Sequence, residues 1–234
     1  MLSKQLNVRM LNACLHARAM STASANPKKV YNYSKLRRTD KRRQFIDETI
    51  RVDHAGELGA LRIYQGQLAV LTRLPNWWSP GVNQVPADSH KSETPIQAIN
   101  HMLEQERGHL EKFEKYMHQY QARPTLLAPL WGAAGYAAGA VSAVMGEKTA
   151  MALTISIEEV IQEHYNDQIR ALHELKLKDV EPELRQTLVQ FRDDEAEHCE
   201  TGIEYHGLEA PLYDVFSKIV KTGCGLVIKV AEKI

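Results

Sequence analysis

The chain has few cysteines, no excess of charge and no glycine-rich nucleotide fingerprint. Only three of its 234 residues are cysteine and none form a Cys-x-x-Cys pair, which argues against a disulfide framework and suits a reducing compartment. Basic and acidic residues both number 29, so no nucleic-acid partner is expected. Gly223-Cys-Gly225 lacks the third glycine of a dinucleotide fingerprint, so no Rossmann domain is expected.

Strand-like alternation is also missing, and apolar residues recur at helical spacing from about residue 43 to the end. The content of 44% hydrophobic and 25% charged residues is that of a single globular domain. Pro95 and Pro182 suit the first turns of helices, and Pro124 marks a stop. The pattern predicts an all-α fold with helices over 41–71, 95–121, 149–176 and 182–207, and a last helix after Pro211.

The first 39 residues carry eight basic side chains and no acidic one before Asp40. Leu2, Leu6 and Met10 recur at four-residue spacing, without a continuous apolar core. A basic, acid-poor, amphipathic segment is typical of a mitochondrial transit peptide. We therefore expect a transit peptide over 1–25, a basic linker over 26–42 and a folded domain over 43–234. The alternative is a disordered basic arm that is never cleaved.

Residues 126–146 form a run of 21 residues without a formal charge, which is long enough to span a bilayer. The candidate functional residues described below fall on both sides of this run, so a single crossing would separate them. We interpret it instead as the long crossover of a four-helix bundle, helical from Pro129 to about Met145. Because it is apolar nearly all round, we expect contact with a membrane interface in preference to burial in an oligomer.

A C-terminal amphipathic helix follows Pro211. One stripe is apolar, and lysines lie beside it at positions 218, 221, 229 and 233. Basic amphipathic helices lie among lipid headgroups, although a helix that only caps the bundle would have the same pattern.

Two Glu-x-x-His motifs are the most informative feature of the chain. They are Glu106-Arg-Gly-His109 and Glu195-Ala-Glu-His198. Residues i and i+3 of a helix share a face, so each motif directs one carboxylate and one imidazole to the same side. One such motif could occur by chance in a chain of this composition. Whether the motifs form a metal site therefore depends on the residues around them.

An internal repeat supplies that context. When Glu57 is aligned with Glu158, Tyr64 falls on Tyr165, and each lone glutamate is followed by one Glu-x-x-His motif. A Glu from each of two helices and a Glu-x-x-His from each of two others form the ligand set of di-iron and di-manganese bundles. We therefore predict a ferritin-like four-helix bundle with an internal two-fold repeat. The alternative is a pair of solvated helices with surface Glu and His.

The repeat also suggests a role for each candidate ligand. Four carboxylates balance the charge of two Fe(II) ions, and oxygen ligands with two imidazoles suit Fe(II) or Mn(II). We expect two terminal glutamates, two bridging glutamates and one histidine for each ion: Glu57 and Glu158, Glu106 and Glu195, His109 and His198.

Other residues near these positions are weaker candidates. Glu159 competes with Glu158, but it points about 100° away on a helix. Asp53 lies one turn before Glu57 and could accept a hydrogen bond from a ligand histidine. His164 and Tyr165 could line a substrate pocket, or form a satisfied core pair.

These motifs resemble those of the mitochondrial 5-demethoxyubiquinone hydroxylases. The resemblance covers about residues 43–234 and includes all six candidate ligands. The insertion over 75–95 departs from the shortest family members but affects no ligand. The segments that carry the resemblance are Arg51–Glu57, Gln105–His109, Glu158–Arg170 and Phe191–His198.

The resemblance implies a di-iron monooxygenase that uses O2 to hydroxylate the ring of a polyprenyl methoxy-methyl benzoquinol. This would be the penultimate step of ubiquinone (coenzyme Q) biosynthesis, with NADH as electron source. It also implies peripheral attachment to the matrix side of the mitochondrial inner membrane, an oligomer, and a biosynthetic complex that includes a lipid-binding partner protein. The alternatives are a quinol-linked di-iron oxidase, an iron-storage protein, which the apolar crossover disfavours, and a non-catalytic member of that complex.

Overall fold

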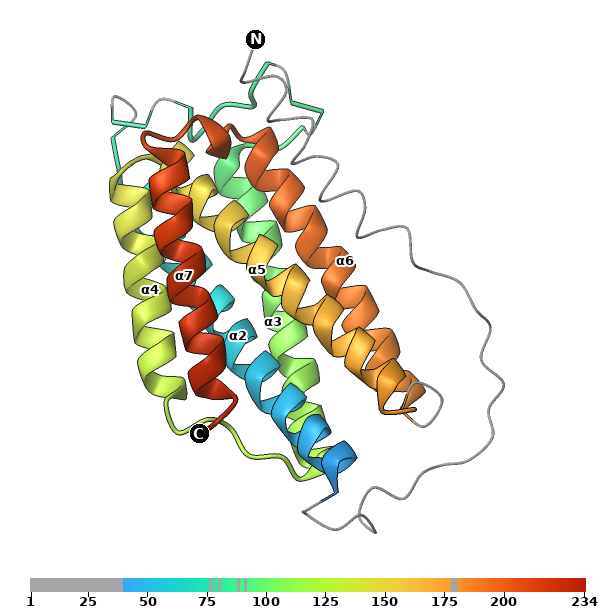
Figure 1. The fold of residues 1–234 in the computed structure, drawn as a ribbon. Helices are drawn as coiled ribbons and strands as arrows, with labels where there is room; N and C mark the ends of the chain where they lie inside the picture. Colours follow the sequence, from blue (N-terminus) through green and yellow to red (C-terminus); the bar gives the residue numbers. More distant parts are fainter. Residues whose placement is uncertain (1–39, 76–77, 80, 88, 91, 178–180) are drawn as a thin grey trace.

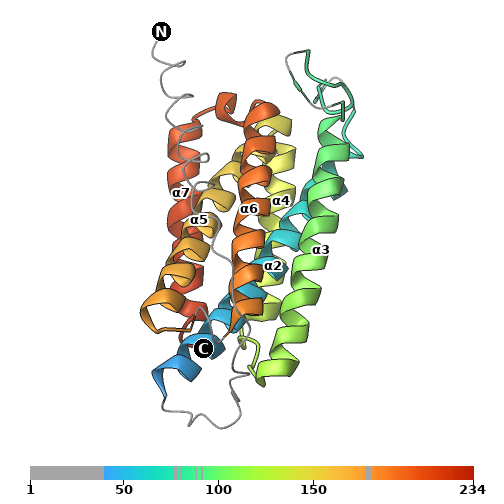
Figure 2. The same ribbon diagram turned by 90° about the vertical axis from the view of Figure 1, so that its right-hand side faces the viewer.

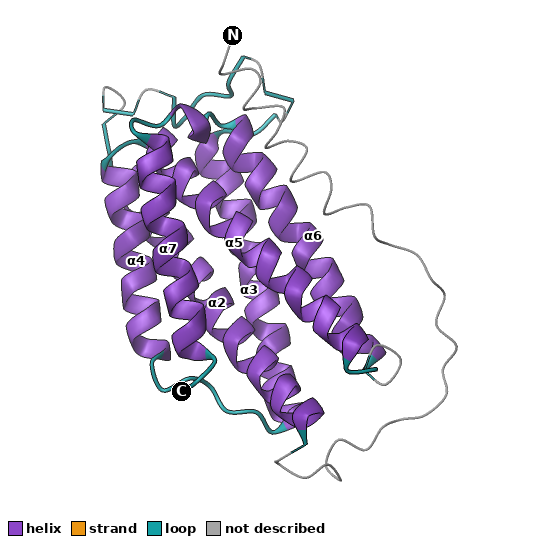
Figure 3. Cartoon of the chain, viewed as in Figure 1, coloured by secondary structure: helices purple, strands orange, loops and turns teal. Residues whose placement is uncertain are grey.

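The computed structural model describes residues 40–75, 78–79, 81–87, 89–90, 92–177 and 181–234. Within this part of the chain all regular structure is helical, as predicted (Figure 3). The predicted transit peptide and residues 26–39 of the predicted linker lie outside it. The helices are α2 (Lys41–Leu71), α3 (Pro95–Tyr120), α4 (Ala128–Val144), α5 (Glu147–Glu174), α6 (Pro182–Glu204), the short 3-10 helix η2 (Gly207–Glu209) and α7 (Tyr213–Ala231).

Local sequence signals explain where the helices begin and end. Thr94 accepts a hydrogen bond from the Gln97 amide and the Gln97 side chain accepts one from the Thr94 amide, which forms a capping box ahead of Pro95. At the end of α6 the prediction extended too far. His206 adopts a left-handed conformation with φ of 62°, so the chain leaves the α-helix at Glu204 and continues as η2.

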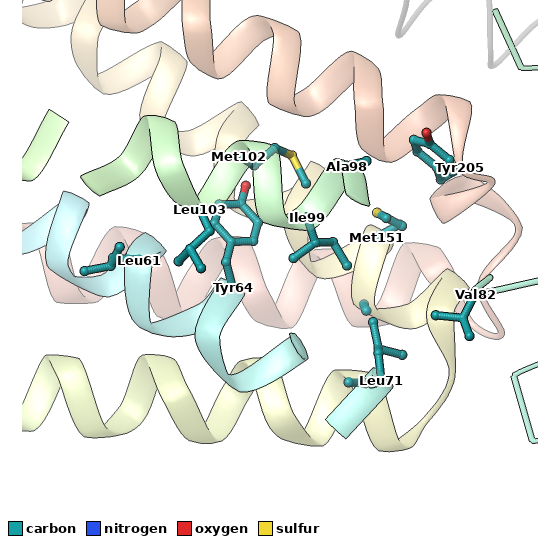
Figure 4. Packing of buried hydrophobic residues seen from close by; sticks show 12 residues of the cluster. Leu61, Tyr64, Leu71, Val82, Ala98, Ile99, Met102, Leu103, Met151 and Tyr205 are labelled. Atoms are coloured by element: carbon teal, nitrogen blue, oxygen red, sulfur yellow. The ribbon is translucent and has the colours of Figure 1, made fainter. Parts of the chain in front are cut away.

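Helices α2, α3, α5 and α6 form the four-helix bundle (Figures 1 and 2). Helix α2 packs along α3, and α5 packs along α6. Two apolar clusters fill the interior. One contains residues of α2, α3 and α5, among them Tyr64, Ile99 and Met151 (Figure 4). The other contains Ile50, Phe113 and further aromatic residues. Along α2, α3 and α5, buried acidic residues lie between residues of the two clusters, so apolar layers separate these acidic residues from water at both ends.

Helix α4 is the crossover between α3 and α5, in agreement with the prediction, and it lies against α2. The contact depends on glycine. A Cβ atom on Gly135 would lie 2.7 Å from the Gly59 carbonyl oxygen, and a Cβ atom on Gly139 would lie even closer to the Ile63 carbonyl oxygen. Small residues therefore let the two helices approach closely. None of the described helices combines the length and the apolar character needed to cross a bilayer.

The outer face of α4 stays uncovered within the described chain, and so does part of α7. Arg51 on α2 anchors the end of α7 by donating hydrogen bonds to the carbonyl oxygens of Ala231 at 3.0 Å and Glu232 at 2.8 Å. Both helices lie beside the α2–α5 pair (Figure 1). The large exposed apolar side chains of these helices and of Leu212, directly before α7, form a surface that we call the outer apolar face: Leu130, Tyr136, Val141, Val144, Leu212, Val215, Ile219 and Leu226.

Candidate metal centre

Six side chains from four helices meet between the two apolar clusters. They are the six that the sequence singled out: Glu57 on α2, Glu106 and His109 on α3, Glu158 on α5, and Glu195 and His198 on α6. Each is at most 4% exposed. They fall into two groups whose potential ligand atoms lie within 4.8 Å of one another.

The composition of the two groups matches the roles expected from the repeat. Glu106 and Glu195 belong to both groups, as bridging ligands would. The first group adds Glu57 and His109, and the second adds Glu158 and His198.

The imidazole rings direct the same nitrogen atom toward the carboxylates. His109 Nδ1 lies 3.4 Å from Glu57 Oε2 and 3.2 Å from Glu195 Oε1. His198 Nδ1 lies 2.9 Å from Glu195 Oε2 and 3.1 Å from Glu106 Oε1. Among the described residues, both Nδ1 atoms, both oxygens of Glu106 and Glu195, and Glu158 Oε2 are buried without a hydrogen-bond partner. Buried polar atoms are seldom left unpaired, so this donor set fits a pair of divalent cations.

Burial and charge repulsion shift the acidity of these groups. Burial, and then the charge of Glu195, raise the pKa values of Glu106 and Glu158 above their ordinary value. Crowded buried carboxylates therefore tend to take up protons. Glu195 behaves differently. Although its burial acts in the opposite direction, the imidazoles of His198 and His109 lower the pKa of Glu195.

Further polar side chains connect the helix pair α2–α3 with the helix pair α5–α6; we call these two pairs the two halves of the bundle. The Tyr165 hydroxyl donates to Glu57, and the Tyr64 hydroxyl donates to Glu158 at 2.7 Å. The outer nitrogens of the imidazoles also have partners, with His109 Nε2 3.1 Å from Asp194 Oδ2 and His198 Nε2 3.2 Å from Gln105 Oε1. Each contact joins a residue of one helix pair to a residue of the other, which is the pattern that a duplicated helix pair would produce. The duplication itself stays a prediction.

The two weaker candidates Asp53 and Glu159 contact side chains outside the group of six. Asp53 accepts a hydrogen bond from Gln168 at 2.7 Å and lies 3.5 Å from His164 Nε2. The expectation that it pairs with a ligand histidine is therefore wrong, because α5 presents these side chains to it first. Glu159 forms an ion pair with Lys221 of α7 at 2.5 Å. Its negative charge is therefore balanced by a lysine and not by the histidines of the centre.

An apolar cavity of about 380 Å³ reaches this centre from the side of α4 and α7. Helices α2, α4, α5 and α7 line it, mostly with apolar side chains. Polar groups also line it: Asp53, Glu57, His164 and Tyr165. His164 and Tyr165 thus do line a pocket, and Tyr165 also contacts a carboxylate of the centre. Sequence reasoning missed Cys224 and Val227 of α7, which line the same cavity.

A polar groove of about 640 Å³ lies between α3 and α6, the two bundle helices that do not line the apolar cavity. Gln105, His109 and Asp194 line it together with Lys112 and Glu183, which form an ion pair across it at 2.8 Å. The centre therefore has an apolar approach beside α4 and α7 and a polar surface beside α3 and α6.

Comparisons with known proteins agree with this arrangement. The family model "Ubiquinone biosynthesis protein COQ7" matches residues 44–231. The chain is 44% identical over 190 residues to the "NADPH-dependent 3-demethoxyubiquinone 3-hydroxylase, mitochondrial" of Dictyostelium discoideum, covering 81% of this chain and 78% of that protein. It is 42% identical over 192 residues to the human protein of the same name, covering 82% and 79%.

A yeast relative extends the comparison. The "5-demethoxyubiquinone hydroxylase, mitochondrial" of Saccharomyces cerevisiae is 35% identical over 206 residues, covering 84% of this chain and 81% of that protein. The family match and these relatives span almost the whole described helical domain. The chain therefore belongs to the COQ7 family of ubiquinone biosynthesis proteins.

Proposed function

We propose that this protein is a demethoxyubiquinone hydroxylase of ubiquinone biosynthesis. It would add one oxygen atom from O2 to the ring of a polyprenyl methoxy-methyl benzoquinol, in the penultimate step of the pathway. The observation that carries the proposal is the meeting of six buried Glu and His side chains with an apolar cavity. Relatives that are named as hydroxylases of this kind support it.

The centre would hold two iron ions. Glu57 and His109 would bind one ion, and Glu158 and His198 the other, with Glu106 and Glu195 shared between them. Bound iron would supply the activation of O2 that ring hydroxylation requires. The protein contributes the surroundings: Tyr64 and Tyr165 orient the terminal carboxylates, and apolar layers exclude water.

The apolar cavity would bind the substrate. Its walls suit an isoprenoid tail and the carbon frame of the ring, while Asp53 and His164 offer polar contacts to ring oxygens. One turnover consumes the substrate, O2, two electrons and two protons, and it yields the hydroxylated ring and water. The electrons would come from a dihydronicotinamide. We propose NADH, whereas several relatives are named NADPH-dependent, and the bound quinone ring would relay the electrons.

The outer apolar face would rest on the matrix side of the mitochondrial inner membrane. Its exposed side chains lie on α4 and α7, the two helices at the outer side of the cavity, so a lipid substrate would reach the centre without crossing water. Lysines 218 and 229 of α7 and Lys233 after it would favour anionic headgroups, whereas Lys221 pairs with Glu159. Mitochondrial names of the relatives support this location. A lipid-binding partner protein, other enzymes of the pathway and further copies of the chain would complete the assembly.

Product analysis tests this function. The full chain, loaded with Fe(II) without oxygen, would receive a demethoxyquinol analogue and then ¹⁸O2. A ring product that carries one ¹⁸O atom, absent in a Glu195→Ala variant, is expected. Oxidation of the quinol to the quinone without a ring oxygen would instead identify a quinol oxidase. Full ubiquinone synthesis in cells that carry Glu195→Ala would identify a structural member of the complex.

A further inference from the structure

We propose that the two ion positions of the centre differ in affinity, and that the position of Glu57 and His109 binds its divalent cation first. This inference rests on the proposed function, because it assumes the pair of ions, but it makes a separate claim about their order. It follows from a difference between the two halves in the residues that surround the ligands.

The first difference lies behind the imidazoles. Asp194 directly precedes Glu195, and Gln105 directly precedes Glu106, so the two residues occupy equivalent places in the repeat. Both contact an imidazole Nε2 of the other half, at 3.1 Å for Asp194 and 3.2 Å for Gln105. The geometry is the same, yet one partner carries a negative charge and the other is a neutral amide.

The second difference lies one turn before the lone glutamates. Asp53 precedes Glu57 by four residues, and Thr154 precedes Glu158 by four. Both side chains are buried. The acidic member again lies beside a ligand of the Glu57–His109 position. Asp53 already has His164 and Gln168 as partners, so Asp194 accounts for most of the difference.

An anionic partner strengthens a histidine ligand in two ways. With Nδ1 facing the ion, Nε2 carries the proton and donates it to the partner, and a carboxylate makes the ring a better electron donor than an amide does. The carboxylate also adds direct attraction for the cation. Removing such partners typically costs about 10- to 100-fold in metal affinity. The Asp194 side chain is 26% exposed in the polar groove, so we expect the lower end, about tenfold.

A metal titration tests the order of binding. Apo-protein of the full chain would be titrated with Mn(II) alone, under argon, with calorimetry and electron paramagnetic resonance as readouts. We expect two binding steps separated by about tenfold. Asp194→Asn should weaken the first step by about tenfold and leave the second unchanged, while Gln105→Glu should strengthen the second. His109→Ala should remove the tight step, and His198→Ala the weak one.

The neighbouring Asp193→Asn is the matched control. Asp193 contacts Arg192 at 2.6 Å and is 38% exposed, and its replacement should leave both steps unchanged. Two equal steps in the unmodified protein would overturn the inference, and so would an Asp194→Asn variant in which both steps weaken equally. A protein that binds no Mn(II) at all would overturn the metal centre of the proposed function as well.

Discussion

The hydroxyl group of Tyr64 on α2 donates a hydrogen bond of 2.7 Å to the carboxylate of Glu158 on α5. Both side chains are at most 1% exposed, so water cannot replace either partner. Tyr165 on α5 donates in the opposite direction, to Glu57 on α2. The two tyrosines thus fix the two lone glutamates from across the bundle.

Tyr64→Phe should destabilise the apo-protein by about 1–3 kcal/mol, because it leaves a buried carboxylate oxygen without its donor. Chemical denaturation measures the change in the free energy of unfolding. Tyr136→Phe is the control, since Tyr136 is 42% exposed on α4 and should change stability by less than about 0.5 kcal/mol. Equal effects of the two substitutions would contradict the importance of the buried hydrogen bond.

Glu106→Gln should have opposite effects on the stability of the apo-protein and on metal binding. Burial and the neighbouring carboxylates raise the pKa of Glu106 above its ordinary value of 4.5. The folded state then keeps a proton that the unfolded state releases, so apo-protein stability falls as the pH rises above 4.5. The neutral amide removes this penalty. The apo-variant should be at least as stable as the unmodified apo-protein, with an advantage that grows from about pH 5 to pH 8.

The same variant should lose the stabilisation that metal provides. A saturating divalent cation raises the free energy of unfolding of the unmodified protein by about 2.7 kcal/mol at 100 times Kd, and Glu106→Gln should abolish most of that gain. Thermal melts with and without Mn(II) measure it. Glu104→Gln serves as the control, because the Glu104 side chain is 62% exposed and pairs with Arg107. An equal loss of metal stabilisation in both variants would argue against Glu106 as a ligand.

The helical fold and the grouping of the six candidate side chains could be predicted from the sequence because both depend on local signals. The bounds of α2 follow from helical spacing after Asp40, whose side chain accepts from the Arg42 amide. The shared face of the Glu and the His of each motif follows from their i, i+3 spacing. These features are fixed within one helix, so the neighbouring helices do not have to be known.

The contacts between helices could not be predicted in the same way. The repeat paired Tyr64 with Tyr165, but only the rotation of α2 against α5 shows that each hydroxyl meets the other half's glutamate. Asp53 was placed wrongly for the same reason, since one-turn spacing gives its face and not its neighbour on α5. The apolar cavity could not be predicted either, because its walls depend on how α7 packs beside α2, and no local sequence pattern shows this packing.

Cys224→Trp should block the apolar cavity and leave the metal centre intact. Cys224 lies on α7 and lines the cavity of about 380 Å³, so an indole there would occupy the space proposed for the quinol ring. We expect kcat/KM for a lipid quinol to fall by about tenfold or more, because small misplacements of a reacting ring are costly. Mn(II) stoichiometry should not change. In the control, Leu226→Trp, the new ring adds to the outer apolar face, since Leu226 is 63% exposed.

Val215→Asp should weaken attachment to membranes. Val215 is 58% exposed on α7 and does not line the cavity, so the change should alter the outer apolar face without touching the substrate site. A carboxylate is poorly accommodated at an anionic, apolar interface. Sedimentation with vesicles that contain cardiolipin should show about a tenfold loss of binding, on the order of one buried apolar side chain. Turnover of a short-chain, water-soluble quinol should be unchanged.

Val85→Asp provides the comparison that makes the membrane test decisive. Val85 is 43% exposed in the segment between α2 and α3, on neither α4 nor α7, so the same change of charge there should leave vesicle binding intact. If both variants lost binding equally, net charge alone would govern attachment and the outer apolar face would have no special role. If neither did, the lipid substrate would have to reach the cavity by another route, such as delivery by a partner protein. Selective loss in Val215→Asp links the exposed side of α7 to the membrane, and therefore the entrance of the cavity to the source of its substrate.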